Sequence, residues 1–505
     1  MKGKLKYGVF LAGALAILAL DVAGAAADGV LTVGRQEDSN NPDPVKAVEN
    51  VNLWVFASMY DVLIRVDPTG TKLEPGLAES WTVSDDQLTY TLKLRDAKFS
   101  DGSPITAEDA AFNLLRIRDH KESAWGSSYA VVKDAKAVDA KTLVITLNQP
   151  TAPFLAWLAM PSLGITQKKQ VEANEASLNE HPVSSGAFIL KEWRKGERLT
   201  LEKNPNYWEA DKVSLDGVEW VSVPDDNTRM LNVQAGELDC AIFVPFSQIE
   251  TLKADPNLNV MLDPSSREDH LLINNASGDL AKVEVRQALD MAIDKQAIVD
   301  TVTFGAGEVA NSFVPKGALY YYAGNKNHPY DPDGAKALLE KAGVKDLTLN
   351  YLVQSGSETD EQTAVLVQQQ LSKIGVTANI NKVDASQYVS TLVEGKYDLG
   401  GVYWTNDIID PDEKVTFAAG HDSNNNFWSN YKNDKVKDLV AQARVEADPA
   451  KREQMYYDIQ KTMKEEVAFI DLYTSPFRNV CGKKVSGFVQ YPLGLFSFQD
   501  VKKGS

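Results

Sequence analysis

Four carboxylates follow a tryptophan in the stretch YWTNDIIDPDE (403–413), at Asp407, Asp410, Asp412 and Glu413. Residues of this type at this spacing could form a catalytic acid pair, a metal-binding loop, the start of a helix or a clamp for a positively charged ligand. Each role needs a different partner. The position of the stretch in the fold therefore decides between them.

The last three acids fit the start of a helix. Asp410 is a favourable N-cap, Pro411 suits the first helical position, and Asp412 and Glu413 would lie near the positive end of the helix dipole. A calcium loop does not fit, because the acids lack the alternate spacing and the glycine of such loops. We therefore expect structural roles for these three side chains.

Asp407 has no place in that helix start. It follows Trp404 by three residues, so that a carboxylate and an aromatic wall could face one cleft. Such a pair can bind an ammonium group through a charge-assisted hydrogen bond and cation–π attraction. Alternatively, Asp407 caps the turn through its own backbone. The residues alone leave both roles open.

Alternating strand and helix patterns lead up to this stretch. The order is a strand at 347–353, a helix at 359–374, a strand at 376–383, a helix at 386–394 and a strand at 397–403. This βαβαβ series predicts a mostly parallel sheet with helices packed on it. Ligands of such sheets bind outside the carboxyl ends of the strands, where the acidic stretch begins.

Further elements are predicted elsewhere in the chain. Alternating apolar residues predict strands in TYTLKLRD (89–96) and KTLVITLN (141–148). Thr106 and Asp109 form a capping-box pattern, which predicts a helix start between those strands. Periodic apolar residues predict a helix over 285–293, and Asp331-Pro332 opens another.

Composition bounds the class of protein. The chain has 505 residues, of which 44% are hydrophobic, and a net charge of −18. These values are typical of a large globular protein. They argue against nucleic acid as a partner, because phosphate binding needs clustered Lys and Arg. The negative charge suits a cationic ligand group, and solubility alone explains it equally well.

The first residues have the layout of a secretory signal peptide. Lys2, Lys4 and Lys6 precede an apolar run at 7–20, and small residues suited to cleavage follow. The run is too short to span a membrane comfortably, and no cysteine follows it to carry a lipid. We expect residues 1–27 to be removed and the mature protein to lie outside the cytoplasm.

Two cysteines occur in the chain, Cys240 and Cys481. An oxidising compartment would permit a disulfide between them. Two separate buried thiols explain them equally well, because their positions alone do not establish pairing.

Several stretches along the chain share a pattern with one family. They are YDVL (60–63), LAESW (77–81), KFSDGSPITAEDAAFNLLR (98–116), NPNYW (204–208), AGELD (235–239), VRQALDMAIDKQAIV (285–299), VPKG (314–317), YDPDGAKALLEKAG (330–343) and YDLGGVYWTNDIIDPDE (397–413). In this order they resemble the periplasmic solute-binding proteins of oligopeptide, dipeptide and nickel ABC importers, extracellular solute-binding protein family 5. One departure is SSGAF (184–188), where the family usually carries Gly-Thr-Gly-Pro-Phe.

The resemblance implies an α/β fold, a two-lobed periplasmic-binding-protein clamshell of the type II-like, cluster C kind. Lobe I would comprise residues 28–268 and 476–505, with an extra subdomain at about 65–183, and lobe II would comprise residues 269–475. The two lobes would close on a ligand by a hinge motion.

The resemblance also implies where a ligand would bind. In peptide-binding members an aspartate after a Trp-x-x spacing pairs with the α-amino group of the ligand, and Asp407 occupies that place. Extended backbone at 403–406 would add strand-like hydrogen bonds to a peptide. The other candidate ligand-binding residues are Trp404, Asn406, Asn426, Trp428, Asp38 and Ser39. Trp428 could equally be a core residue, and no arginine for a ligand carboxylate can be placed from the sequence.

The function implied is that of the periplasmic substrate-binding component of an ABC importer. It would capture a peptide-like ligand and deliver it to a permease in the inner membrane, as a monomer without a cofactor or a resident metal. An opine, an amino-acid–sugar conjugate, an oligosaccharide or a metal chelate is the alternative ligand, although no His-x-x-His or Cys-x-x-Cys pair predicts a metal site. A secreted hydrolase ranks lower, because Gly-x-Ser-x-Gly, His-Glu-x-x-His and Walker A patterns are absent and the five histidines are scattered.

Overall fold

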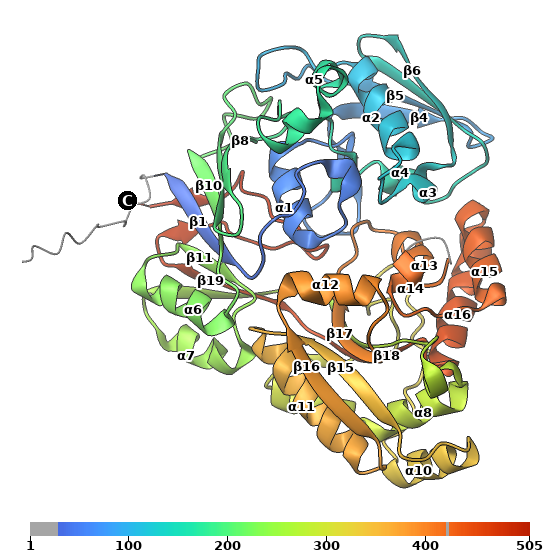
Figure 1. The fold of residues 1–505 in the computed structure, drawn as a ribbon. Coiled ribbons are helices and arrows are strands. Elements are labelled where there is room, and N and C mark those ends of the chain that lie inside the picture. The colour runs from blue at the N-terminus through green and yellow to red at the C-terminus, as the bar shows by residue number, and fades with distance from the viewer. Residues whose placement is uncertain (1–28, 421–423, 505) are drawn as a thin grey trace, which may run out of the picture.

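The computed structural model describes residues 29–420 and 424–504, which form two lobes (Figure 1). The predicted signal peptide at 1–27 lies outside the described residues. Within them, no helix is long and apolar enough to cross a membrane.

The first lobe is built on a seven-stranded mixed sheet in the order β12-β19-β11-β1-β10-β9-β8. Strand β1 pairs in parallel with β10 and β11 near its centre. The strands are β1 (Val30–Arg35), β8 (Phe188–Arg194), β9 (Arg198–Lys203), β10 (Gly217–Ser222), β11 (Cys240–Ile242), β12 (Leu258–Asp263) and β19 (Phe477–Gly482). Because β19 follows the whole second lobe in sequence, the chain leaves this sheet after β12 and later returns to it.

Helices α1 (Asn50–Met59), α6 (Asp226–Ala235) and α7 (Ile249–Ala254) pack beside this sheet, and a short pair, β20 (Val485–Ser486) and β21 (Lys502–Lys503), completes the lobe. A disulfide joins Cys240 of β11 to Cys481 of β19. These residues are directly paired in the sheet. The disulfide therefore fastens the returning C-terminal segment to the first lobe.

A subdomain extends from the first lobe and carries an antiparallel sheet in the order β4-β5-β7-β6, with α2 packed on it (Figure 1). Its elements are β4 (Ala78–Val83), β5 (Thr89–Leu94), α2 (Ala107–Asp119), α3 (Gly126–Tyr129), β6 (Val132–Asp139), β7 (Thr142–Leu147), α4 (Phe154–Trp157) and α5 (Lys168–Ala173), preceded by the pair β2 (Ile64–Val66) and β3 (Leu73–Pro75). The predicted capping box is confirmed. The hydroxyl of Thr106 accepts the Asp109 N–H, and the Asp109 carboxylate accepts the Thr106 N–H at 3.1 Å.

The second lobe is built on a six-stranded sheet in the order β14-β18-β13-β17-β15-β16. Its strands are β13 (Glu268–Ile273), β14 (Glu308–Val309), β15 (Thr348–Gln354), β16 (Thr377–Val383), β17 (Leu399–Trp404) and β18 (Phe469–Thr474). The three strands of the predicted βαβαβ series are parallel. The prediction of a mostly parallel sheet is wrong for the six-stranded sheet as a whole, since β13, β14 and β18 form antiparallel pairs. Strands β13 and β18 carry the chain from and to the first lobe, so helical crossovers do not set their direction.

Helices cover both faces of this sheet, with α11 and α12 beside β15 and β16 (Figure 1). The helices are α8 (Val283–Ala292), α9 (Lys295–Val302), α10 (Pro332–Lys341), α11 (Glu358–Ser372), α12 (Ala385–Val393), α13 (Asp412–Ala419), α14 (Asn424–Phe427), α15 (Asp434–Val445) and α16 (Pro449–Glu465). The predicted helices therefore match α8, α10, α11 and α12. Each prediction agrees with the structure within about two residues, the usual uncertainty of a helix end.

The helix after the acidic stretch starts differently from the prediction. Helix α13 begins at Asp412, and Pro411 rather than Asp410 is its N-cap. The Asp410 carboxylate accepts the Asp412 N–H at 2.9 Å and both terminal nitrogens of Arg452. Asp410 therefore lies in the turn before the helix, where its carboxylate is paired with Arg452. The N-cap prediction for Asp410 is therefore wrong, whereas Asp412 and Glu413 lie in the first turn of α13 as predicted, and Asp412 pairs with Arg444.

Candidate ligand-binding cleft

A cavity of about 190 Å³ lies where the two lobes meet. It opens at the carboxyl ends of three strands, β1 in the first lobe and β15 and β17 in the second, where ligands of open sheets bind. Its lining includes Gln36, Glu37 and Trp54 of the first lobe and Gln354, Tyr403 and Trp404 of the second. Contact between the lobes therefore creates the cavity.

Hydrogen bonds between the lobes surround this cavity. Gln354 Nε2 donates to Glu37 Oε1 at 2.7 Å, and Asn50 Nδ2 donates to Thr405 Oγ1 at 3.1 Å. The backbone carbonyl of Gly356 in the second lobe accepts the Asp226 N–H of the first lobe at 3.2 Å. These bonds join the two lobes beside the cavity.

Asp407 lies three residues past the end of β17 and lines the cavity. The residue is only 6% exposed. No hydrogen bond or ion pair reaches its carboxylate from the residues that the structure describes. Burial raises the pKa of this carboxyl well above its ordinary value. A buried carboxylate without a partner costs free energy, so its position favours a cationic partner from outside the protein.

Glu413 is a buried acidic neighbour of Asp407. Its Oε2 accepts the Asp407 backbone N–H at 3.4 Å, and its Oε1 is buried without a partner. Burial and the neighbouring Asp407 raise the pKa of Glu413. Two neighbouring buried carboxyls do not both ionise readily. An incoming cation would relieve this repulsion, which gives Glu413 a role that the helix-start pattern did not suggest.

Aromatic rings form one wall of the cavity beside Asp407. Trp404 packs on Phe417 and Phe427 with ring centroids 4.9 and 4.7 Å apart, and Trp428 packs on Phe427 at 5.3 Å. The indole nitrogens of Trp404 and Trp428 are buried without hydrogen-bond partners. The structure thus brings three of the predicted site residues, Asp407, Trp404 and Trp428, to one cavity.

Two other predicted site residues pack behind that wall. The backbone N–H of Asn406 donates to Ser266 Oγ at 3.1 Å, and its side-chain oxygen is buried without a partner. Asn426 Nδ2 donates to the backbone carbonyl of Tyr431. Neither asparagine is among the residues that line the cavity.

The last two predicted residues are occupied within the first lobe. The Asp38 carboxylate accepts hydrogen bonds from Arg35, from the Trp193 indole and from the Gly196 backbone. Ser39 Oγ donates to the Val51 carbonyl at 3.0 Å. Both lie in the predicted loop but away from the cavity, which Gln36 and Glu37 line instead. Those two residues directly follow the carboxyl end of β1, a signal that could have identified them.

Other charged residues of the cavity were not predicted. Arg267 donates to both oxygens of Asp269 at 3.0 and 2.6 Å, and its guanidinium lies 3.7 Å from the Tyr403 ring centre. Asp360 lies in the first turn of α11, where burial raises its pKa to about 6. Arg478 enters from β19 of the first lobe. These residues come from distant parts of the sequence, and no local pattern marks them.

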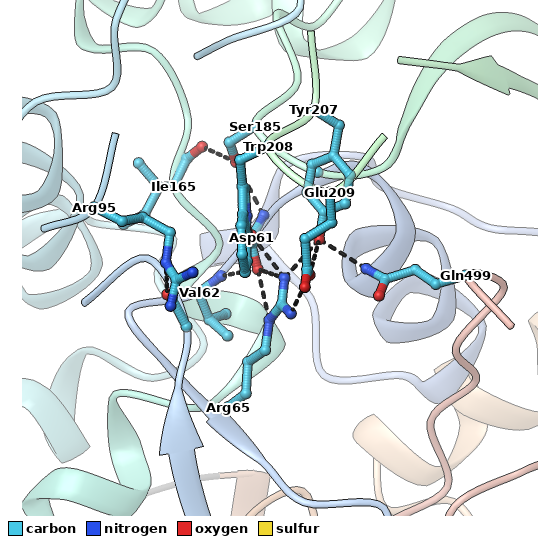
Figure 2. A network of polar contacts seen from close by, with 12 residues as sticks. Asp61, Val62, Arg65, Arg95, Ile165, Ser185, Tyr207, Trp208, Glu209 and Gln499 are labelled. Carbon is cyan, nitrogen blue, oxygen red and sulfur yellow. Dashed lines mark hydrogen bonds and ion pairs between the residues drawn. The ribbon is translucent and has the colours of Figure 1, made fainter. Parts of the chain in front are cut away.

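A second cavity, of about 350 Å³, lies in the first lobe and shares Asp407 with the first. A paired network borders it (Figure 2). Arg65 donates to Asp61 at 2.9 Å, to Glu209 at 2.9 Å and to the Tyr207 hydroxyl at 2.6 Å, and the Trp208 indole donates to Asp61 at 2.7 Å.

The SSGAF segment reaches the same network. Ser185 Oγ accepts the Asp61 N–H at 3.0 Å and donates to the Ile165 carbonyl at 2.7 Å (Figure 2). Three of the stretches singled out in the sequence therefore meet here, and their polar groups satisfy one another.

Residues 29–420 and 424–504 contain no cluster of three or more His, Cys, Asp or Glu side chains that could hold a metal ion. Of the histidines, His270 contacts Glu268 and Asp471, and His328 contacts Asp290, all within the second lobe. These contacts lie away from Asp407 and add no group to its side of the cavity.

Known proteins share this fold and much of this sequence. The family model for bacterial extracellular solute-binding proteins, family 5 Middle, matches residues 72–427. The chain is 30% identical over 481 residues to the probable D,D-dipeptide-binding periplasmic protein DdpA of Escherichia coli (strain K12), with 92% of each chain covered.

Two solved structures have closely similar folds. The ABC transporter-associated periplasmic binding protein DppA from Helicobacter pylori, in complex with peptide STSA, aligns with a TM-score of 0.87 and 26% identity over 95% of this chain and 98% of that chain. AgaA from A.tumefacien R10, in complex with agropinic acid, aligns with a TM-score of 0.86 and 27% identity over 94% and 99%. The similarity spans both lobes and the cavity between them.

Proposed function

Because the chain belongs to family 5 of the bacterial extracellular solute-binding proteins, we propose that it binds a short peptide-like ligand between its lobes and delivers it to an ABC permease. In this proposal the protein binds its ligand and does not transform it. The closed lobes would present the surface that the permease recognises.

The observation that carries the proposal is the unpaired carboxylate of Asp407. It is buried beside the Trp404 wall, and no cation of the described chain pairs with it. A ligand ammonium would supply the missing positive charge, with cation–π attraction from the aromatic wall. This arrangement suits the amino end of a peptide, as the resemblance implied.

The compartment and assembly belong to the same proposal. Export through a cleaved segment at 1–27 would place the protein in the periplasm as a monomer. There an inner-membrane permease would be its partner. The names of the relatives, which include a periplasmic dipeptide-binding protein and an ABC transporter-associated one, support this placement.

An opine is the second candidate ligand. The agropinic acid bound by AgaA shows that a protein of this fold with 27% identity holds a ligand of that class. Side-chain contacts within the cleft, and not the fold, choose between the two ligand classes.

Isothermal titration calorimetry with short peptides tests the role of Asp407. Asp407→Asn should weaken the binding of an unmodified peptide by about 2–5 kcal/mol, the usual loss when one partner of a buried charged pair is removed. N-acetylation of the peptide removes the same contact from the ligand side and should weaken binding to the wild type by a similar amount.

Asp434→Asn is the matched control, because this exposed aspartate lies in the first turn of α15 in the same lobe. It should bind like the wild type. Equal affinity of the wild type and Asp407→Asn for the unmodified peptide would remove Asp407 from the site.

A further inference from the structure

Ile408, which directly follows Asp407 in the second lobe, is buried in a core that belongs to the first lobe. Its side chain is fully buried, in the hydrophobic cluster that contains the core of the subdomain. All the other buried members of this cluster lie between Val45 and Ile165, and Ile409 packs against it. A segment of the second lobe therefore supplies a side chain to a core that the first lobe builds.

Helix α13 continues this contact between the subdomain and the second lobe. All eight of its residues are buried. The Phe417 ring of this helix lies 6.2 Å from the Trp125 ring of the subdomain and 4.9 Å from the Trp404 ring, measured between centroids. Aromatic rings at these separations attract one another. The three rings therefore link the subdomain to the aromatic wall of the cavity.

A backbone hydrogen bond joins the subdomain to the helix beside α13. The Ala152 N–H of the subdomain donates to the carbonyl of Arg444 in α15 at 2.9 Å. The Arg444 side chain in turn pairs with Asp412 at 3.1 Å and donates to Thr416 Oγ1 at 2.8 Å, both in α13. Helices α13 and α15 therefore meet the subdomain as one unit (Figure 1).

No direct chain connection holds Ile408 in the subdomain. The chain passes to the second lobe between β12 and β13, and it returns between β18 and β19. The contacts of Ile408 and Phe417 with the subdomain are therefore non-covalent, and opening of the lobes would expose the isoleucine to water. Closure would bury it again, which is favourable for an apolar side chain.

We propose that the subdomain receives Ile408 when the lobes close, and that this docking holds Asp407 where it meets the ligand. The inference rests on the proposed function, because Asp407 is the residue assigned to the ligand amine. Ile408 is a positioning residue, since it does not line the cavity and acts through the backbone of its neighbour. Docking touches no ligand atom, so it strengthens every ligand by the same factor.

Chemical labelling of an introduced thiol tests whether Ile408 docks reversibly. Both cysteines of the chain form the disulfide, so Ile408→Cys carries one free thiol. The probe ligand is the tightest binder from a pool of unmodified dipeptides and tripeptides. A maleimide should label this thiol readily in the ligand-free protein, and a saturating amount of the peptide should slow labelling at least about 10-fold, because closure buries the site.

Two matched variants calibrate the labelling rates. Ile145→Cys lies in β7 and in the same hydrophobic cluster, but all its surroundings are supplied by the first lobe. Its thiol should stay protected with and without the peptide. Leu231→Cys lies on α6, where the native side chain is 55% exposed, and its thiol should be labelled quickly in both states.

Affinity and stability distinguish a docking residue from an ordinary core residue. Ile408→Ala should weaken the peptide about 10- to 100-fold, mainly through faster dissociation, because the closed form loses an apolar contact. The melting temperature of the ligand-free protein should stay within about 2 °C of the wild type, since the open form does not use that contact. Ile408→Val should restore most of the affinity, because it removes a single methylene.

The outcomes separate this inference from the proposed function. If the thiol of Ile408→Cys is as protected as that of Ile145→Cys in the ligand-free protein, the contact is permanent and the inference is overturned. An unchanged labelling rate in the presence of a bound peptide also overturns it. If no peptide of the pool raises the melting temperature of the wild type, the proposed function fails instead, and the ligand-free labelling rate still decides whether Ile408 docks reversibly.

Discussion

Two polar clusters built from similar residues behave in opposite ways in this molecule. Around Asp61 and Arg65, each charged group meets an opposite charge or a hydrogen-bonding partner (Figure 2). In the cleft, the Asp407 carboxylate and Arg478 Nη1 have no partner among the described residues. Satisfied polar networks fix a structure, whereas unsatisfied buried groups need an explanation. The difference separates an architectural cluster from a binding site.

Residue type alone does not make this distinction, because both clusters contain aspartate, arginine and tryptophan. What differs is whether the chain brings a partner back to the same place. Gln499, near the C-terminus, donates to Tyr207 at 2.7 Å and completes the Asp61 cluster (Figure 2). No segment of the described chain brings a hydrogen-bonding or charged partner to the Asp407 carboxylate.

The largest predicted effect breaks the paired cluster. Asp61→Ala should lower the free energy of unfolding by about 3 kcal/mol, because it leaves the Trp208 indole N–H without its acceptor and removes one of the two carboxylates that pair with Arg65. Urea unfolding followed by circular dichroism measures this loss. A loss below about 1 kcal/mol would show that the cluster is not structural.

The second predicted effect is a gain in the free energy of unfolding, and it concerns the unpaired carboxyl of Asp407 in the cleft. Burial raises the pKa of Asp407 in the folded protein above its unfolded value, so the folded state binds more protons and loses stability as pH rises from about 4. Asp407→Asn removes this dependence. In the ligand-free protein it should raise the free energy of unfolding by about 1–2 kcal/mol at pH 7, with the gain vanishing near pH 4.

Unfolding of the wild type and Asp407→Asn at a series of pH values gives the comparison, with Glu413→Gln as a companion variant. Glu413→Gln should show the same sign, because burial and the nearby Asp407 carboxyl raise the pKa of Glu413 in the folded protein. A stability difference that does not depend on pH would mean that Asp407 keeps an ordinary pKa in the folded protein.

The smallest expected effect concerns an exposed ion pair at the edge of the Asp61 cluster. Lys212 forms an ion pair with Glu209, but its side chain is 61% exposed. Lys212→Ala should change the free energy of unfolding by less than about 1 kcal/mol, as is usual for an exposed pair. A loss close to that of Asp61→Ala would show that exposure does not govern the strength of pairs in this cluster.

Much of the second lobe could be predicted from local pattern. The helices and strands from 347 to 403 follow apolar periodicity and end at expected residues, and Gly343 and Gly375 adopt left-handed backbone angles where helices α10 and α11 end. Periodicity could not predict the antiparallel neighbours of β17, because β13 and β18 reach the sheet from the other lobe. The Cys240–Cys481 disulfide likewise depends on the return of β19 to the first sheet.

The site was predicted only where its residues are close in sequence. Trp404 and Asp407 follow one strand and line the cavity together. Asp38 and Ser39 lie in the predicted loop, but the partners Arg35, Trp193 and Val51 draw them into the first lobe. Arg478 and Asp360 reach the cavity through long-range packing, which a local pattern does not encode.

The most direct test of the account is mass spectrometry of the protein purified gently from its export compartment, first native and then denatured. The expected result is a bound peptide-like molecule that is released on denaturation and carries a free amine, the group that the buried Asp407 carboxylate would pair with. Release of a neutral oligosaccharide, or of any ligand without an amine, would contradict the assignment of Asp407 and with it the account of the cleft.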